Sequence, residues 1–224
     1  ALGNLGLAYG KLGDYAKAIE YYQQSLAIAR EINNRQGESA SLGNLGAVYL
    51  NLKDLPRAIE FVQQSLAIAR EINDRQLEAT AGEALGNLGV AYHSIGDYSK
   101  EVECFQQSLA IAQEIKDRRG EAKALGGLGN AYHSLGDYAK VIEYQQQSLA
   151  MSREIKNRVG EGAALGNLGL AYQFLGDYAK AAEYFQQSLA IAQDSKNRQV
   201  EEASLGNLGI AYLGLGDYAK AIEY

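Results

Sequence analysis

The sequence has too little of several residue classes to support some common kinds of protein. Its one cysteine, Cys104, excludes an internal disulfide framework and a structural zinc site built from cysteines. Its 21 basic side chains are outnumbered by 27 acidic ones, so no basic excess is available to bind nucleic-acid phosphates. No apolar run approaches the roughly 18–20 residues that a membrane-spanning helix needs. We therefore expect no nucleic-acid partner, no membrane partner and a reducing, cytoplasmic location.

What the chain has instead is a recurring pentapeptide, Leu-Gly-Asn-Leu-Gly. Five intact copies lie at Leu2–Gly6, Leu42–Gly46, Leu85–Gly89, Leu165–Gly169 and Leu205–Gly209. A sixth copy, Leu125–Gly129, has Gly127 in place of the asparagine. Successive copies start 40 residues apart, except for 43 between the second and third. A fixed period in this range predicts a stack of identical supersecondary units.

The first repeat predicts two helices. Apolar residues from Leu2 to Leu12 recur at steps of three and four, as on one helix face. Gly13 suits the left-handed residue that ends a helix, and Asp14 can cap the next one. A second apolar stripe then continues to about Ile32. In each of the first five repeats a short polar link follows, ending in a residue that can cap the next helix: Asn34, Asp74, Asp117, Asn157 or Asn197.

This pattern predicts one array of repeats over residues 1–224. The repeats cover residues 1–34, 35–74, 75–117, 118–157, 158–197 and, in part, 198–224. The two glycines in each first helix cost roughly 1 kcal/mol apiece relative to alanine, so we expect them to permit close helix contact. The chain enters and leaves the pattern inside a helix, so we expect either a piece of a longer array or ends that stack on other copies.

The order of these residues resembles the tetratricopeptide repeat. The small, aromatic and alanine positions of that motif are matched by Asn4–Tyr9 and by Gly13, Asp14, Tyr15, Ala18 and Tyr22. A leucine replaces the motif's first large aromatic residue, and its closing proline is absent. The 40-residue variety is similar to LGN/Pins-type adaptors and to bacterial tetratricopeptide arrays. The resemblance implies an all-α superhelix, or α–α solenoid, of stacked antiparallel helix–turn–helix hairpins whose first helices line a concave groove.

The resemblance also implies which residues face that groove. They are the pentapeptide asparagine, the residue after the second glycine, and the two residues after the tyrosine. We expect the peptide-binding residues to be Asn4, Asn44, Asn87, Asn130, Asn167, Asn207, Leu7, Val90, Leu170, Ile210, His93, His133 and Phe174. An asparagine can both donate to and accept from the main chain of an extended peptide. The alternative is that the asparagines bond to the neighbouring repeat and stabilise stacking.

Apolar residues are the second component of the expected groove. Exposed apolar area in a concavity usually marks a binding site. In the alternative, the long second helices shift the packing and bury these side chains. His93 and His133 occupy equivalent places one repeat apart, and neither lies in a pattern that provides a base beside a nucleophile. We expect them to be groove-wall residues, and we expect no catalytic residue, metal or cofactor.

The centre of the array departs most from the repeat. Three extra residues fall near Ala79–Gly82, and Glu101 replaces the small alanine of other repeats. A buried, unpaired carboxylate is costly, so Glu101 must find a partner, turn outward or displace its helix. Gly127 removes one asparagine, and Gln145 replaces an aromatic residue. These departures indicate either a functional site or neutral drift in a redundant array.

The leading functional hypothesis is a non-enzymatic scaffold that binds a peptide or partner segment in the groove. One alternative is the regulatory or sensor region of a larger signalling enzyme or ATPase. Another is an array that self-associates end to end. The near-identity of the repeats also leaves a natural or an engineered origin open.

Overall fold

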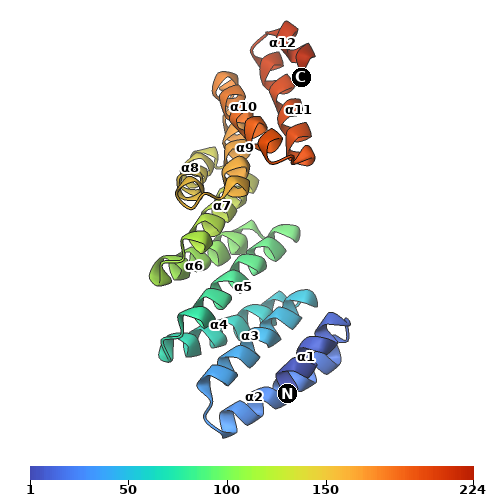
Figure 1. Ribbon diagram of the computed structural model, residues 1–224, viewed down its shortest axis with the longest axis vertical. Coiled ribbons are helices and arrows are strands. Elements are labelled where there is room, and N and C mark those ends of the chain that lie inside the picture. The colour runs from blue at the N-terminus through green and yellow to red at the C-terminus, as the bar shows by residue number, and fades with distance from the viewer. The chain divides into compact units, whose positions relative to one another are not determined.

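The structure, a computed structural model, describes residues 1–224 and consists of helices joined by short turns (Figure 1). The helices are α1 (Leu2–Lys11), α2 (Tyr15–Glu31), α3 (Arg35–Asn51), α4 (Leu55–Glu71), α5 (Arg75–Ser94), α6 (Tyr98–Ile115), α7 (Arg118–Ser134), α8 (Tyr138–Glu154), α9 (Arg158–Phe174), α10 (Tyr178–Asp194), α11 (Arg198–Gly214) and α12 (Tyr218–Glu223). Consecutive odd- and even-numbered helices form helix–turn–helix hairpins. The predicted all-α fold of stacked hairpins is confirmed.

The chain divides into two compact units, residues 1–120 and residues 121–224. Unit 1 contains the three hairpins from α1 to α6, and unit 2 contains the three hairpins from α7 to α12, except the first residues of α7. Within unit 1 the first helices α3 and α5 contact each other, and within unit 2 so do α9 and α11. The assignment of the whole chain to one array stays a prediction. No helix combines the length and the apolar character that crossing a membrane requires.

The helix boundaries follow the sequence signals closely. Gly13 has a φ of +80°, the left-handed conformation that favours glycine, and it separates α1 from α2. The Asp14 carboxylate accepts a hydrogen bond of 3.2 Å from the Lys17 amide, and Asn34 likewise accepts one of 2.9 Å from the Gly37 amide. Both side chains satisfy amides that the start of a helix leaves without a partner. The predicted caps and turns are therefore confirmed in the first repeat.

The three extra residues near Ala79–Gly82 lengthen a helix. α5 has 20 residues, whereas α3, α9 and α11 have 17 each. The addition is nearly one full turn of 3.6 residues, so the following residues keep almost the same face toward the core. Leu85 and Leu88 of α5 are fully buried, as are their counterparts in α3. The insertion therefore leaves the packing pattern intact.

The two pentapeptide glycines have different roles. A Cβ atom added to the second glycine would lie 2.8 Å from the Tyr22 ring at Gly6, and 2.5 Å from the Phe185 ring at Gly169. Only glycine lets the second helix approach this closely. At the first glycine, an added Cβ would meet nothing within 4 Å at Gly3 and only Ser65 Oγ, at 3.4 Å, at Gly43. The expectation that both glycines serve close contact is therefore wrong for the first one.

Neighbouring hairpins are joined by buried glutamates held between arginines. In unit 1, Glu38 accepts hydrogen bonds from Arg30 Nε at 2.8 Å and from Arg35 Nη1 at 2.5 Å. In unit 2, Glu161 accepts from Arg153 Nε at 2.8 Å and from Arg158 Nη1 at 2.6 Å. One arginine comes from the end of the preceding hairpin and the other from the same helix as the glutamate. This clamp crosses between repeats, because one of its arginines belongs to the preceding hairpin.

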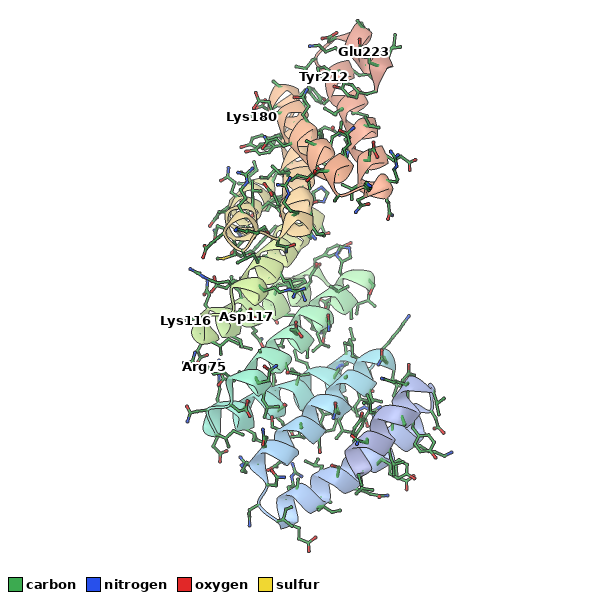
Figure 2. All side chains as sticks on the ribbon, viewed as in Figure 1. Arg75, Lys116, Asp117, Lys180, Tyr212 and Glu223 are labelled. Atoms are coloured by element: carbon green, nitrogen blue, oxygen red, sulfur yellow. The ribbon has the colours of Figure 1, made fainter.

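The third repeat makes a related contact at its end. Arg75, at the start of α5, donates a hydrogen bond of 3.3 Å to the carbonyl oxygen of Ile115, next to Lys116 and Asp117 (Figure 2). Lys116 has a φ of +61° and ends α6 in the left-handed conformation. The arginine therefore satisfies a carbonyl that the end of a helix leaves without a partner.

Each hairpin except the third is also joined by two stacked aromatic rings. Tyr172 and Tyr184 stack with centroids 5.5 Å apart, and the Lys180 ammonium lies 4.9 Å from the Tyr172 ring (Figure 2). In the third hairpin Cys104 takes the place of the second ring, beside Tyr92. Burial raises the pKa of the Cys104 thiol to about 11. The thiol is therefore protonated near neutral pH and suits a packing role, because the thiolate is the reactive form.

Candidate functional site

The structure places the predicted binding residues on the first helix of every hairpin. We call those of unit 1 the unit 1 face; they are Asn4 and Leu7 on α1, Asn44 on α3, and Asn87, Val90 and His93 on α5. The unit 2 face consists of Asn130 and His133 on α7, Asn167, Leu170 and Phe174 on α9, and Asn207 and Ile210 on α11. Residues three or four apart share one face of a helix, so Asn4, Asn87, Asn167 and Asn207 each lie beside an apolar residue three positions later, whereas Asn130 lies beside His133.

The apolar members of both faces are largely exposed. Val90 is 60% exposed, Phe174 is 57% exposed, and Leu7 and Ile210 are each 50% exposed. The leucines on the opposite side of the same helices, such as Leu88 and Leu208, are fully buried. Leu170 is the exception, because it is half-buried and packs against the core around Phe185. The structure therefore does not show the alternative, in which the long second helices bury these residues. Leu170 alone is partly buried.

The asparagines differ in how far their amides are already engaged. Asn4, Asn44 and Asn87 are exposed, and their side chains make no hydrogen bond within the chain. Asn167 donates from Nδ2 to Asn130 Oδ1 at 2.8 Å, which joins α9 to α7. The stacking role therefore holds for this pair, while the asparagines of unit 1 keep their full capacity for a ligand.

The departures of the fourth repeat lie together. The Gln145 side chain, 1% exposed, donates from Nε2 to Asn130 Oδ1 at 3.1 Å and to the Gly126 carbonyl at 3.2 Å. A Cβ atom on Gly129 would lie 2.4 Å from Gln145 Nε2, so this side chain occupies the space that an aromatic ring fills in other repeats. The sequence marks Gln145 and Asn130 as unusual, but their 15-residue separation gives no sign that they meet.

An aromatic cluster covers one end of the unit 2 face. The Phe174 ring stacks on the Tyr138 ring with centroids 5.2 Å apart. It also makes a T-shaped contact with the His133 ring, with centroids 5.3 Å apart. Because Phe174 comes from α9 and its two neighbours from the preceding hairpin, the cluster spans two repeats. His133 Nε2 and Gln173 Oε1 are both buried and make no hydrogen bond within the chain. Tyr138 is a member of this surface that the sequence analysis did not identify.

His93, the counterpart of His133 in unit 1, has a different neighbour. Its Nδ1 lies 3.0 Å from Glu101 Oε2, and Glu101 is only 2% exposed. Burial raises the pKa of the Glu101 carboxyl, and the hydrogen bond to His93 opposes that shift. Of the three outcomes expected for Glu101, the structure shows the first: the carboxylate finds a partner.

No group of three or more histidine, cysteine, aspartate or glutamate side chains is arranged to hold a metal ion. His93 and Glu101 form the one histidine–carboxylate contact. What the two faces offer chemically is apolar area and side-chain amides.

The comparisons with known proteins agree with this geometry. The sequence profile of the tetratricopeptide repeat matches residues 1–71, 80–154 and 160–224. The chain therefore belongs to the tetratricopeptide repeat family, whose repeat is typically a non-enzymatic interaction module. No curated protein sequence matched the chain.

Three solved structures show how widely this fold is shared. BtubC (BKLC) from P. vanneervenii is 19% identical, with a TM-score of 0.71 over 93% of this chain and 87% of that protein. The signal transduction ATPase PH0952 from Pyrococcus horikoshii, which has a tetratricopeptide repeat sensor, is 19% identical, with a TM-score of 0.74 over 99% of this chain but 34% of the ATPase. A Rap protein complexed with competence and sporulation factor is 18% identical, with a TM-score of 0.54 over 99% of this chain and 71% of the Rap protein. At these identities the likeness shows the fold alone.

Proposed function

We propose that the chain is a non-enzymatic interaction module whose first-helix faces bind an extended segment of a partner protein or a peptide in a concave groove. The observation that carries this proposal is the exposure of Leu7, Val90, Phe174 and Ile210 on the same faces as the asparagines. Large exposed apolar side chains grouped on one surface of a protein commonly mark an interaction site. The amides beside them supply hydrogen bonds that an apolar surface lacks.

The chemistry of the faces favours a main chain as the bound group. Each peptide unit of an extended segment offers one N–H donor and one C=O acceptor, and a carboxamide offers both complements. Apolar side chains of the segment would then pack beside Val90 on the unit 1 face, or beside Phe174 and Ile210 on the unit 2 face. Binding of this kind depends little on charge, so we expect weak salt dependence.

Family and neighbours support the same class of partner. The tetratricopeptide repeat suggests protein–protein interaction. One structural neighbour, the Rap protein, was solved with competence and sporulation factor bound. By analogy with that complex, we propose protein or peptide partners for this chain as well.

The proposal is tested with peptides selected on the full chain from a random library of N-acetylated, C-amidated nonapeptides. Phe174→Asp is expected to weaken binding of the best peptide about thirtyfold, the usual size for a central apolar contact. Val159→Asp is the matched control, because Val159 lies on the same helix and is 75% exposed, but at the other end. Equal loss with both variants, or no loss with either, would contradict the proposal. Leu170 is a poorer choice, because its packing against the core couples binding to folding.

A second candidate function is the sensor region of a larger signalling ATPase. The observation that favours it is the structural match to PH0952. The match includes 99% of this chain but only 34% of the ATPase. The sequence of the complete gene decides between the two. A nucleotide-binding domain in the same open reading frame supports the sensor role, and an open reading frame made only of repeats rejects it.

Two further expectations stay predictions. End-to-end self-association predicts a molecular mass by light scattering that rises with concentration, and a constant monomer mass would reject it. A cytoplasmic location is tested by fractionating the source cells, with recovery in another compartment as the contrary result.

A further inference from the structure

The fourth repeat breaks the pattern at three places that converge on one hydrogen-bonded cluster. Gly127 replaces the pentapeptide asparagine, Asn130 replaces an apolar residue, and Gln145 replaces an aromatic ring. Gln145 contacts Asn130, and Asn130 in turn contacts Asn167 of the next repeat. We call Gln145, Asn130 and Asn167 the amide chain. The asparagines of unit 1 belong to no comparable cluster.

The orientations of the three carboxamides in the amide chain follow from one another, starting at the buried Gln145. A backbone carbonyl only accepts hydrogen bonds, so the Gln145 atom 3.2 Å from the Gly126 oxygen must be the nitrogen. That nitrogen also faces Asn130 at 3.1 Å, so Asn130 must present its oxygen inward. The same oxygen then requires the nitrogen of Asn167, 2.8 Å away. The buried Gln145 donor thereby determines the orientation of both the Asn130 and the Asn167 carboxamides.

The outward halves of the two asparagines are left for a ligand. Asn130 is exposed and its Nδ2 makes no hydrogen bond within the chain, so its two N–H groups are available. Asn167 Oδ1 accepts none within the chain either. The pair therefore presents a donor and an acceptor side by side, which is the complement of the C=O and N–H of one residue in an extended chain, because these two groups point to the same side.

We infer that Gln145 is a positioning residue that fixes the Asn130 and Asn167 carboxamides to hold the N–H and C=O of one residue of an extended polypeptide. This inference rests on the proposed function and specifies where on the unit 2 face the main chain is held. A freely rotating asparagine presents either end of its amide, whereas this pair presents only one arrangement. Fixing the arrangement before binding removes part of the ordering cost that binding otherwise carries.

The surrounding surface specifies the segment further. Phe174 follows Asn167 by seven residues on α9, which corresponds to about 10 Å along the helix axis. An extended chain covers that distance in about three residues. The segment that fits therefore carries a large apolar side chain about three residues away from the residue whose main chain Asn130 and Asn167 hold. His133 and Tyr138 would contact the same side chain through the aromatic cluster.

A purely structural reading of Gln145 makes different predictions. In that reading Asn130 exists only to satisfy a polar side chain in an aromatic's place, and restoring the ring would leave binding unchanged. The repeat itself supplies the variant, because Phe105 and Phe185 occupy the equivalent place against Gly89 and Gly169. Gln145→Phe is therefore expected to fold, and Gln145→Met is the reserve variant with a similar volume.

A second variant separates the two roles of the Asn130 side chain, namely the oxygen that faces Gln145 and the N–H groups that face a ligand. Asn130→Asp keeps an oxygen for Gln145 and Asn167 but replaces the outward N–H groups by a second oxygen. It is expected to preserve the amide chain and the melting temperature while losing the donor that faces the ligand. Gln146→Glu is the matched control, because it makes the same change in charge at an exposed amide on α8, away from the first-helix faces.

The experiment measures the affinity of the best blocked nonapeptide for the full chain by fluorescence anisotropy, with side-chain amide NMR spectra and melting temperatures of each variant. Gln145→Phe and Asn130→Asp are each expected to weaken binding about tenfold with the melting temperature kept. The two changes combined are expected to weaken binding no more than either alone, because both remove the same oriented donor. In the wild-type spectrum the peptide should shift the Asn130 and Asn167 side-chain signals.

Two outcomes overturn the inference while the proposed function stands: unchanged affinity in Gln145→Phe, or fully additive losses in the combined variant. In both cases peptide-induced shifts would still map to first-helix asparagines. A different result, no shift of any asparagine side chain on either face, defeats the proposed function itself. The loss of the Asn167 amide's hydrogen-bonded shift in free Asn130→Asp would overturn the assumed geometry without reference to any ligand.

Discussion

Two histidines at equivalent positions, His93 in unit 1 and His133 in unit 2, have opposite surroundings. His93 Nδ1 lies 3.0 Å from the buried carboxylate of Glu101. His133 has Val141 at the corresponding place eight residues later, and Phe174 lies against the edge of its ring. One histidine is therefore part of a polar contact, and the other is part of an aromatic wall.

Repeat position therefore fixes where a side chain lies but not what chemistry it takes part in. Both histidines replace residues that vary between repeats, such as Gly10 and Leu50. The surroundings of each histidine depend on one residue of the adjoining helix, Glu101 or Val141. The same residue determines whether the hairpin interior contains a carboxyl group. The two units can thus be converted toward each other by single substitutions.

The largest expected effect comes from adding a carboxylate where no histidine is near. Ala58, fully buried in unit 1, has Leu50 eight residues before it, so Ala58→Glu should cost about 4 kcal/mol of unfolding free energy. Val141→Glu should cost about 1–2 kcal/mol less, since His133 can partner the new carboxylate. Denaturant unfolding followed by circular dichroism measures both. Equal costs would show that a histidine eight residues earlier does not compensate for burial of the carboxylate.

A smaller effect is expected from removing the existing partner. His93→Ala leaves Glu101 buried without a hydrogen-bond donor, which should cost about 2–3 kcal/mol. The double variant His93→Ala/Glu101→Ala should recover most of that loss, because alanine fills the Glu101 place in other repeats. Unfolding of both variants gives the coupling free energy directly. A double variant less stable than His93→Ala would contradict the account.

The smallest effect is a difference in pH dependence between two buried glutamates of unit 1. The hydrogen bond from Arg30, with a second from Arg35, lowers the pKa of Glu38 below its ordinary 4.5, so the stability it contributes is present above pH 4.5 and is lost as pH falls below that value. Burial raises the pKa of Glu101 above 4.5, so its ionisation lowers stability as pH rises from that value through the higher folded pKa.

The two Glu→Gln variants measure this contrast. Glu38→Gln should lose stability relative to the wild type at neutral pH and approach it in acid. Glu101→Gln should match the wild type most closely in acid and gain on it as pH rises above 4.5. Unfolding curves from about pH 3 to about pH 8 give both differences. Parallel curves for the two variants would show that the glutamates have the same environment.

Features encoded by neighbouring residues could be predicted from the sequence. The Gly13 turn, the Asp14 and Asn34 caps and the longer α5 helix all depend on residues within a few positions of one another. The repeat period places the pentapeptide leucines on one helix face, and both leucines are buried in the second to fifth repeats. The family followed from the same local pattern.

Contacts between distant residues could not be predicted in this way. The Arg30–Glu38–Arg35 clamp extends across a link between repeats, and Gln145 meets Asn130 through the packing of two helices. Each member was visible in the sequence as an unusual or charged residue, but nothing in one sequence states which pairs meet. The role of the first pentapeptide glycine was misjudged because close approach depends on the neighbouring side chain, which periodicity does not reveal.

The central claim is that ligands bind the first-helix faces and not the outer surface of the second helices. The chain has an internal control for it, since exposed glutamines such as Gln23, Gln63 and Gln146 lie on α2, α4 and α8. The most direct measurement is a titration of the ¹⁵N-labelled chain with the best blocked nonapeptide, observing all side-chain amides. The account predicts that asparagine signals of at least one first-helix face move while these glutamine signals stay in place. Movement of the glutamines with the asparagines unchanged would contradict it.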